Sequence, residues 1–122
     1  MNNTENAVSI HPYFKIHPGK LDAVKALLPA FILKTATEKQ NLYYGFSLSG
    51  DILFCREAYV DADALLAHVE NIGLELGQML TLANVERVEV HGPAAELDKL
   101  RGPLASLKPT WFTWLGGVSR GL

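Results

Sequence analysis

The side chains of this chain best suited to proton transfer are those of His68 and two tyrosines. An imidazole has an ordinary pKa of about 6.5, so it can accept or release a proton near neutral pH. His68 lies beside Leu65 and Ile72 at helical spacing, which predicts that it points towards a sheet. It could act as a general base there, with Tyr44 or Tyr59 holding the developing oxyanion. The alternative is a buried histidine whose two ring nitrogens bond to backbone or tyrosine partners.

A second set of reactive side chains lies on one apolar strand. Arg56 and Glu57 are neighbours, so they point to opposite faces and do not pair with each other. A buried charge needs a partner, and we expect a cross-strand or cross-dimer ion pair for each residue. Activation of a ligand by either one is the alternative. Cys55, the single cysteine, has no His or Lys beside it and is predicted to be an inert buried thiol.

The sequence predicts neither a metal site nor an organic cofactor. His11 and His17 are separated by about 20 Å if the chain between them is extended at ~3.3 Å per residue, too far to share one ion. No other acidic or histidine cluster has metal-ligand spacing. A phosphate loop, a nucleophile elbow and a dinucleotide fingerprint are also missing from the sequence.

Size and composition restrict the partners. The 122 residues suit one domain, with 13 acidic and 11 basic side chains, and this near-neutral balance argues against nucleic acid. No apolar run approaches the ~20 residues that cross a bilayer, so no membrane is expected. Met1 to Asn6 lack the pattern of a signal peptide, and the one cysteine fits a reducing compartment. A cytoplasmic protein is predicted.

The elements that must position these residues begin with a strand and a helix. Apolar residues alternate from Val8 to Ile16, which indicates a strand, and Pro12 predicts that it is an edge or carries a bulge. A Pro-Gly turn follows at 18–19, and then a helical stripe, which Pro29 should bend. The stripe consists of Leu21, Val24, Leu28, Phe31, Ile32 and Thr35.

The second half repeats strands before another helix. Strands over about 42–48 and 52–60 flank a tight turn, so they should form a hairpin. Asp61 or Asp63 caps the next helix, and a fourth strand covers about 85–90. One face of that helix carries Leu65, Val69, Ile72, Leu76 and Met79. This βαββαβ order predicts an α+β, ferredoxin-like fold, with a four-stranded antiparallel sheet and two helices on one face.

The other face of the sheet has no helical cover in this arrangement. Leu53 and Cys55 alternate with Ile52 and Phe54, so both faces of the third strand are apolar. We therefore expect a homodimer, in which Leu53 and Cys55 lie on the face away from the helices and become covered.

Three segments are predicted. Residues 1–6 should be disordered or extended, residues 7–92 form the ferredoxin-like domain, and residues 93–122 are an extension. Within the extension, Ala94 to Arg101 reads as a helix, with another turn over 104–108. Trp111, Phe112 and Trp114 then form an aromatic tail that should dock on the body or the partner subunit, and across the dimer interface in our interpretation.

The region from Val8 to Val90 resembles the dimeric α/β-barrel superfamily, and within it the antibiotic-biosynthesis-monooxygenase-like domains. The resemblance rests on the first strand with its Pro-Gly turn and on the pattern Glu57-x-Tyr59-x-Asp61-x-x-Ala64-Leu65-x-x-His68. It implies two sheets packed face to face in a dimer and a ligand pocket between sheet and helices. Members include cofactor-free oxygenases of aromatic polyketides and heme-degrading enzymes.

The heme-degrading branch does not fit these residues. It keeps an Asn on the first strand, a Trp early in the second helix and an axial His further along. The matching positions here hold Pro12, His68 and Gln78, and a glutamine is a poor axial ligand for iron. Heme chemistry is not expected.

Two functions remain open. The first is an antibiotic-biosynthesis-monooxygenase-like oxidoreductase, a cofactor-independent oxygenase that acts on an apolar enolisable or aromatic small molecule. The second is a non-catalytic binding protein for an apolar compound, fatty-acyl or polyketide-like. Both use a pocket whose predicted walls, besides Tyr44, are Ile10, Phe14, Leu28, Ile32, Phe46, Leu65 and Ile72.

Overall fold

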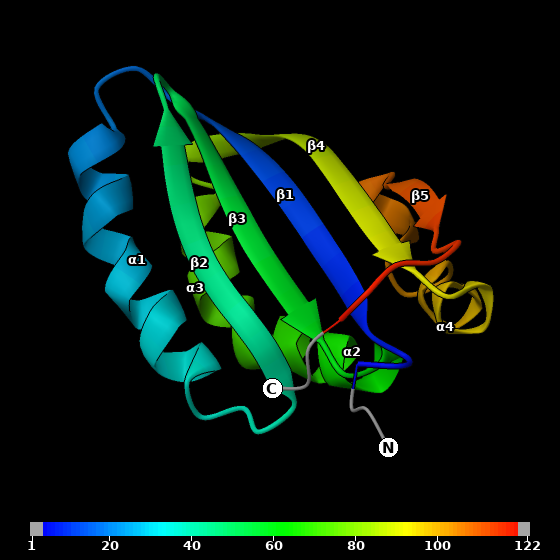
Figure 1. Ribbon diagram of the computed structural model, residues 1–122. Helices are drawn as coiled ribbons and strands as arrows, with labels where there is room; N and C mark the ends of the chain where they lie inside the picture. The colour runs from blue at the N-terminus through cyan, green and yellow to red at the C-terminus, as the bar shows by residue number, and fades with distance from the viewer. Residues whose placement is uncertain (1–3, 120–122) are drawn as a thin grey trace.

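The computed structural model describes residues 4–119, which contain a mixed five-stranded sheet (Figure 1). Its strands run in the order β2-β3-β1-β4-β5, with antiparallel pairing except between β4 and β5, which are parallel. They are β1 (Val8–Ile16), β2 (Asn41–Ser49), β3 (Ile52–Tyr59), β4 (Ala83–Gly92) and β5 (Thr110–Thr113). The ferredoxin-like α+β fold is confirmed, and the parallel fifth strand is an addition to it.

The helices of the described region pack on one face of this sheet (Figure 1). They are α1 (Leu21–Thr35), α2 (Ala62–Asn71), α3 (Gly73–Met79) and α4 (Ala94–Leu100), followed by a short 3-10 turn at Ala105–Leu107. None of the helices within residues 4–119 has the length and apolar character that spanning a bilayer requires.

The predicted second helix is divided in two. The Asp61 side chain accepts a hydrogen bond from Ala64 N at 2.9 Å and so caps α2, as the sequence suggested. The helix stops at Ile72, whose φ of −101° leaves helical geometry, and α3 begins at Gly73. Glycine is less favourable in a helix than most other residues, because it loses the most backbone conformational entropy on folding.

Strand β1 lies between β3 and β4, which excludes the first of the two predicted alternatives, an edge strand. The predicted bulge is confirmed: the β1–β4 register shifts between Tyr13 and Phe14, one residue beyond Pro12. Proline cannot donate to a ladder hydrogen bond, and an irregularity beside it lets a central strand contain one.

The two faces of β3 are the reverse of our expectation. Leu53 and Cys55 are buried on the helix side, and Phe54 and Arg56 lie on the outer face. Because side chains alternate along a strand, Glu57 follows Leu53 and Cys55 to the inside. Glu57 is thus buried among the helices while Arg56 remains exposed.

Two hydrophobic clusters form the core. The first contains residues from the start of β1, the end of β3, α2, β4 and α4, and includes Val8, Tyr59, Leu65, Val90 and Leu97. The second joins α1 and α3 to the other ends of the strands, and includes Phe14, Val24, Phe31, Leu53 and Met79.

The C-terminal extension docks on the sheet of its own chain. Trp111 packs against the first cluster, and the guanidinium of Arg101 lies 5.0 Å from its ring centroid. Phe112 stacks on His91 at 4.5 Å on the outer face. The tail is therefore bound to the body, while its contact with a partner subunit stays a prediction. At the other terminus residues 4–6 form a turn, and residues 1–3 of the predicted disordered segment lie outside the described residues.

Gly92, at the end of β4, allows a close approach of two chain segments. A Cβ there would lie 2.8 Å from Val8 Cγ1 and 3.4 Å from Leu97 Cδ2. We expect Gly92→Ala to lower the free energy of unfolding by about 1–3 kcal/mol, the usual cost of overpacking. Urea unfolding measures this loss. Gly45→Ala is the matched strand control, since its Cβ would meet nothing within 4 Å, and an equal loss in both variants would contradict the packing argument.

Candidate active site

An apolar cavity of about 80 Å³ lies between the sheet and the helices, where the two hydrophobic clusters meet. Its walls include Ile10 and Val88 from the first cluster and Phe14, Phe31 and Met79 from the second. The polar or ionisable side chains among its lining residues come from β2, β3 and α2, and are Tyr44, Cys55, Glu57 and His68. A ligand here would meet hydrocarbon nearly everywhere and a small polar group at one place.

Part of the predicted wall is found at this cavity. Ile10, Phe14, Phe46 and Ile72 line it, together with Tyr44 and His68. Three other predicted residues do not: Ile32 is 48% exposed on α1, Leu28 packs against the second cluster, and Leu65 is buried within the first. The predicted apolar stripe of α1 includes one residue too many, because Ile32 lies on the solvent side of the helix.

Glu57 is the central polar residue of the site. The residue is 5% exposed, and its Oε1 accepts a hydrogen bond from Tyr59 Oη at 2.6 Å. His68 Nε2 lies 3.3 Å from the same oxygen. Burial raises the pKa of the Glu57 carboxyl, and the opposing effects of His68 and Tyr59 are smaller. A carboxyl with a raised pKa can serve as a general acid or a general base closer to neutral pH.

His68 is 2% exposed and is held by carboxylates at both ring nitrogens. Nδ1 lies 2.9 Å from Glu38 Oε2, and Nε2 faces Glu57. This agrees with the interpretation of His68 as a buried histidine with protein partners at both nitrogens, but the partners are carboxylates rather than backbone or tyrosine groups. It also corrects the ion pair expected for Glu57, because the partner comes from α2 rather than from a neighbouring strand.

The tyrosines and the thiol of the site are neutral hydrogen-bonding groups. Burial raises the pKa of Tyr44, of Tyr59 and of the Cys55 thiol well above their ordinary values. Cys55 is buried, as predicted. The Tyr44 ring lies 5.2 Å from the His68 ring and lines the cavity, whereas the Tyr59 hydroxyl donates its hydrogen bond to Glu57. Tyr44 is therefore the better placed of the two to meet a ligand oxygen.

Sequence reasoning missed the inward position of Glu57 and the contact of Glu38 with His68. Strand alternation places Glu57 on the same face as Leu53, Cys55 and Tyr59. An inward position for Tyr59 would therefore have indicated that Glu57 also points inward. Glu38 lies in the loop between α1 and β2 and approaches His68 only through the fold. No local pattern indicates that contact.

The described residues hold no group of three or more His, Cys, Asp or Glu side chains suited to a metal ion. His11 bonds to Ser9 Oγ at 2.9 Å, and His17 bonds to Asn84 Oδ1 at 3.1 Å. The two histidines thus have separate protein partners.

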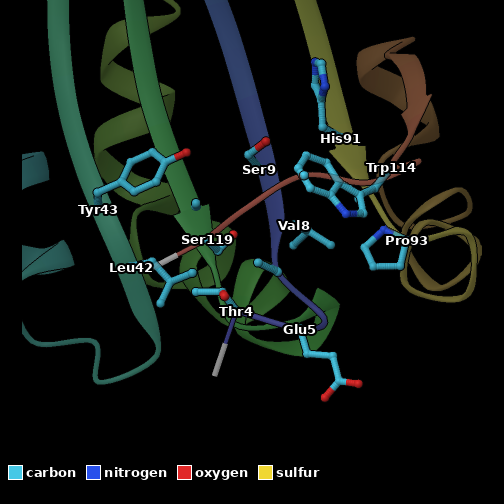
Figure 2. A pocket seen from close by; sticks show the side chains of 14 residues that line it. Thr4, Glu5, Val8, Ser9, Leu42, Tyr43, His91, Pro93, Trp114 and Ser119 are labelled. Carbon is cyan, nitrogen blue, oxygen red and sulfur yellow. The ribbon is translucent and has the colours of Figure 1, made fainter. Parts of the chain in front are cut away.

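A larger hollow of about 670 Å³ lies on the outer face of the sheet (Figure 2). Ser9, Tyr43 and His91 project into it from the strands, and Trp114 closes one side from the tail beyond β5. Its lining contains no carboxylate–imidazole pair like that of Glu57 and His68. The inner cavity is therefore the candidate for chemistry.

Comparison with known proteins adds to this geometry. The chain matches no protein-family model and no curated protein. Among solved structures, it is 47% identical to MupZ from Pseudomonas fluorescens, with a TM-score of 0.90, over 94% of this chain and 95% of that one. The chain belongs to the MupZ family.

The match to MupZ covers nearly the whole chain, so it includes most of the C-terminal extension. Other structures match about 70% of it. Rv0793 from Mycobacterium tuberculosis is 27% identical over 71% of this chain and 94% of that one, with a TM-score of 0.65. A putative antibiotic biosynthesis monooxygenase from Caulobacter crescentus is 18% identical over 71% and 89%, with a TM-score of 0.64. The resemblance to antibiotic-biosynthesis-monooxygenase-like proteins is thus confirmed at the level of the fold.

Proposed function

We propose that this member of the MupZ family is an enzyme that acts on an apolar small molecule by proton transfer, without a metal or organic cofactor. The observation that carries the proposal is Glu57, a buried carboxyl with a raised pKa on the wall of an apolar cavity. A solely structural site would place an apolar residue here at lower cost, because burying a carboxyl disfavours its charged form. The hydrogen bond from Tyr59 and the nearby imidazole of His68, whose Nε2 lies 3.3 Å from Oε1, hold the carboxyl in one orientation.

The first step follows from the positions of these groups. Glu57 as carboxylate removes a proton from a carbon next to a carbonyl or phenol, and the electron pair moves onto the substrate oxygen. Tyr44 donates a hydrogen bond to that developing oxyanion. His68 supports the change of charge at Glu57, since its Nε2 faces the same carboxylate. The reverse direction, in which protonated Glu57 acts as an acid on a substrate oxygen, uses the same contacts.

The specific form of this function that we favour is oxygenation, because antibiotic-biosynthesis-monooxygenase-like proteins share the fold. The carbanion passes one electron to O₂, and the two radicals combine to a hydroperoxide on carbon. Loss of water from the hydroperoxide converts the CH₂ group to a carbonyl. One O₂ is consumed and one water is formed for each substrate, so the reaction needs no further reductant.

The alternative is an apolar-compound binding protein, fatty-acyl or polyketide-like, and the almost wholly apolar lining favours it. In that case Glu57 and His68 contact a polar end of the ligand and no bond changes.

An anthrone serves as a probe that separates these functions. Incubation in deuterated buffer under nitrogen measures proton transfer alone, and O₂ uptake in air measures oxygenation. We expect catalysed deuterium exchange in both conditions and O₂ uptake in air. Exchange without O₂ uptake would restrict the function to proton transfer, and tight binding without exchange would favour the binding protein.

We also propose that the protein is a homodimer in which the outer sheet faces meet. No helix of residues 4–119 covers that face, which carries Tyr13, Phe54 and Arg56 beside the hollow of Figure 2. A twofold interface would cover these rings with their own copies.

Phe54→Asp is expected to convert the dimer to a monomer, because it places a charge among the rings of Tyr13 and His11 on that face. Light scattering at micromolar concentration measures the mass of both proteins. Leu33→Asp is the control, as Leu33 is 71% exposed on α1, on the helical side. A monomeric native protein would overturn the proposed dimer.

A further inference from the structure

Glu38 is anchored beside His68 by two side chains of α2. Its Oε1 and Oε2 lie 3.1 and 2.9 Å from His68 Nδ1, and Asn71 Nδ2 donates to Oε2 at 2.9 Å. The same Asn71 amide donates to Lys34 O at 3.0 Å and so ties the end of α1 to α2. The Glu38 side chain is 14% exposed, so it has access to water that His68 and Glu57 lack.

The three residues form a continuous series from the cavity to the surface. Glu57 lines the cavity, His68 contacts Glu57 through Nε2, and Glu38 contacts His68 through Nδ1. An imidazole that gains a proton at one nitrogen can release one from the other. A carboxylate at Nδ1 stabilises the imidazolium state that this exchange passes through.

We propose that Glu38 is the positioning and proton-release residue of the site: it orients the His68 ring and exchanges protons between the Glu57–His68 pair and water. This inference rests on the proposed proton-transfer function. A proton taken from the substrate by Glu57 passes to His68 Nε2, and the Nδ1 proton passes to Glu38 and then to solvent. Each turnover thus restores the Glu57 carboxylate, and only protons move along the series.

The other ionisable groups around the series do not provide this route. Burial keeps Tyr44, Tyr59 and Cys55 protonated well beyond their ordinary pKa values. Lys34 pairs instead with Glu75, at 3.1 Å. Among residues 4–119, Glu38 and Glu57 are the carboxylates that contact the His68 ring.

The test uses Glu38→Ala and Glu38→Gln in the full chain. We expect Glu38→Ala to lower kcat for deuterium exchange into an anthrone about 10- to 100-fold with KM little changed, since the ring loses its orientation and its proton outlet. Added formate should restore part of the rate, because it replaces the missing carboxylate. Glu70→Gln, an exposed change of the same charge on α2, should leave rate and formate response unaltered.

A second measurement needs no substrate. In the native protein the Nδ1 proton of His68 should give a slowly exchanging ring N–H resonance, which Glu38→Gln shifts and Glu38→Ala removes, while both variants keep the native circular dichroism. An unchanged resonance in both variants would overturn the positioning role. An altered resonance with full turnover and no effect of formate would overturn proton release. If the native protein turns over no probe but the resonance behaves as expected, the proposed function fails and the Glu38–His68 contact stands.

Discussion

Glu57→Gln is expected to lower turnover of an enolisable probe by about two to four orders of magnitude, the usual contribution of a positioned general acid or base. Glutamine keeps the shape of the side chain and an oxygen for the Tyr59 hydrogen bond, but it cannot take up a proton. The fold should therefore persist while the chemistry is lost. The measurement is deuterium incorporation into the anthrone under nitrogen, with thermal unfolding of both proteins to verify folding.

His68→Ala should also reduce this rate, and the double variant shows whether the two residues act as one unit. If they do, the double variant loses about as much activity as the more damaging single variant, because the effects of substitutions within one catalytic unit are not additive. Glu70→Gln, exposed on the surface of α2, is the control. Native turnover in Glu57→Gln would refute Glu57 as the proton-transfer group, whatever His68→Ala does.

Deleting residues 109–122 is the change expected to affect stability most. It removes β5, whose pairing with β4 extends from Thr110 to Thr113, and it removes Trp111 from the first hydrophobic cluster. Partial burial of an indole and its neighbours contributes about 2–4 kcal/mol to the free energy of unfolding. Urea unfolding of the truncated chain should show this loss, and the melting temperature should fall with it.

Two point variants separate the causes of that loss. Trp111→Ala should account for much of it, since this ring contacts both the cluster and the Arg101 guanidinium. Leu115→Ala should have no effect, because Leu115 is 97% exposed. If the truncated protein unfolds at the native urea concentration, the extension does not stabilise the domain and its docking is incidental.

Periodicity predicted most of the fold because local patterns determine it. Alternation over Val8–Ile16 and the helical stripe from Leu21 to Thr35 give the correct elements with bounds close to those observed. The parallel pairing of β5 was not predicted, because strand partners far apart in the sequence leave no local trace. The break at Gly73 was missed because the apolar repeat continues through it to Met79.

The site was predicted only in part for a related reason. The spacing of His68 beside Leu65 and Ile72 placed it in the interior, where it lies. Its partners come from β3 and from the loop after α1, and the sequence separation between Glu38 and His68 is 30 residues. The assignment of Leu53 and Cys55 to the outer face failed because both faces of β3 carry apolar residues, so alternation alone did not fix the direction.

The short length of β5 also bears on how copies of this chain associate. Without it, β4 would present an unpaired row of backbone donors and acceptors at the border of the sheet, a template for strand addition from another molecule. The chain pairs the Glu89–Gly92 end of that border with a strand of its own, which covers only four residues and is too short to recruit another strand firmly. Growth into open-ended, strand-linked fibres is thereby disfavoured at this end of β4.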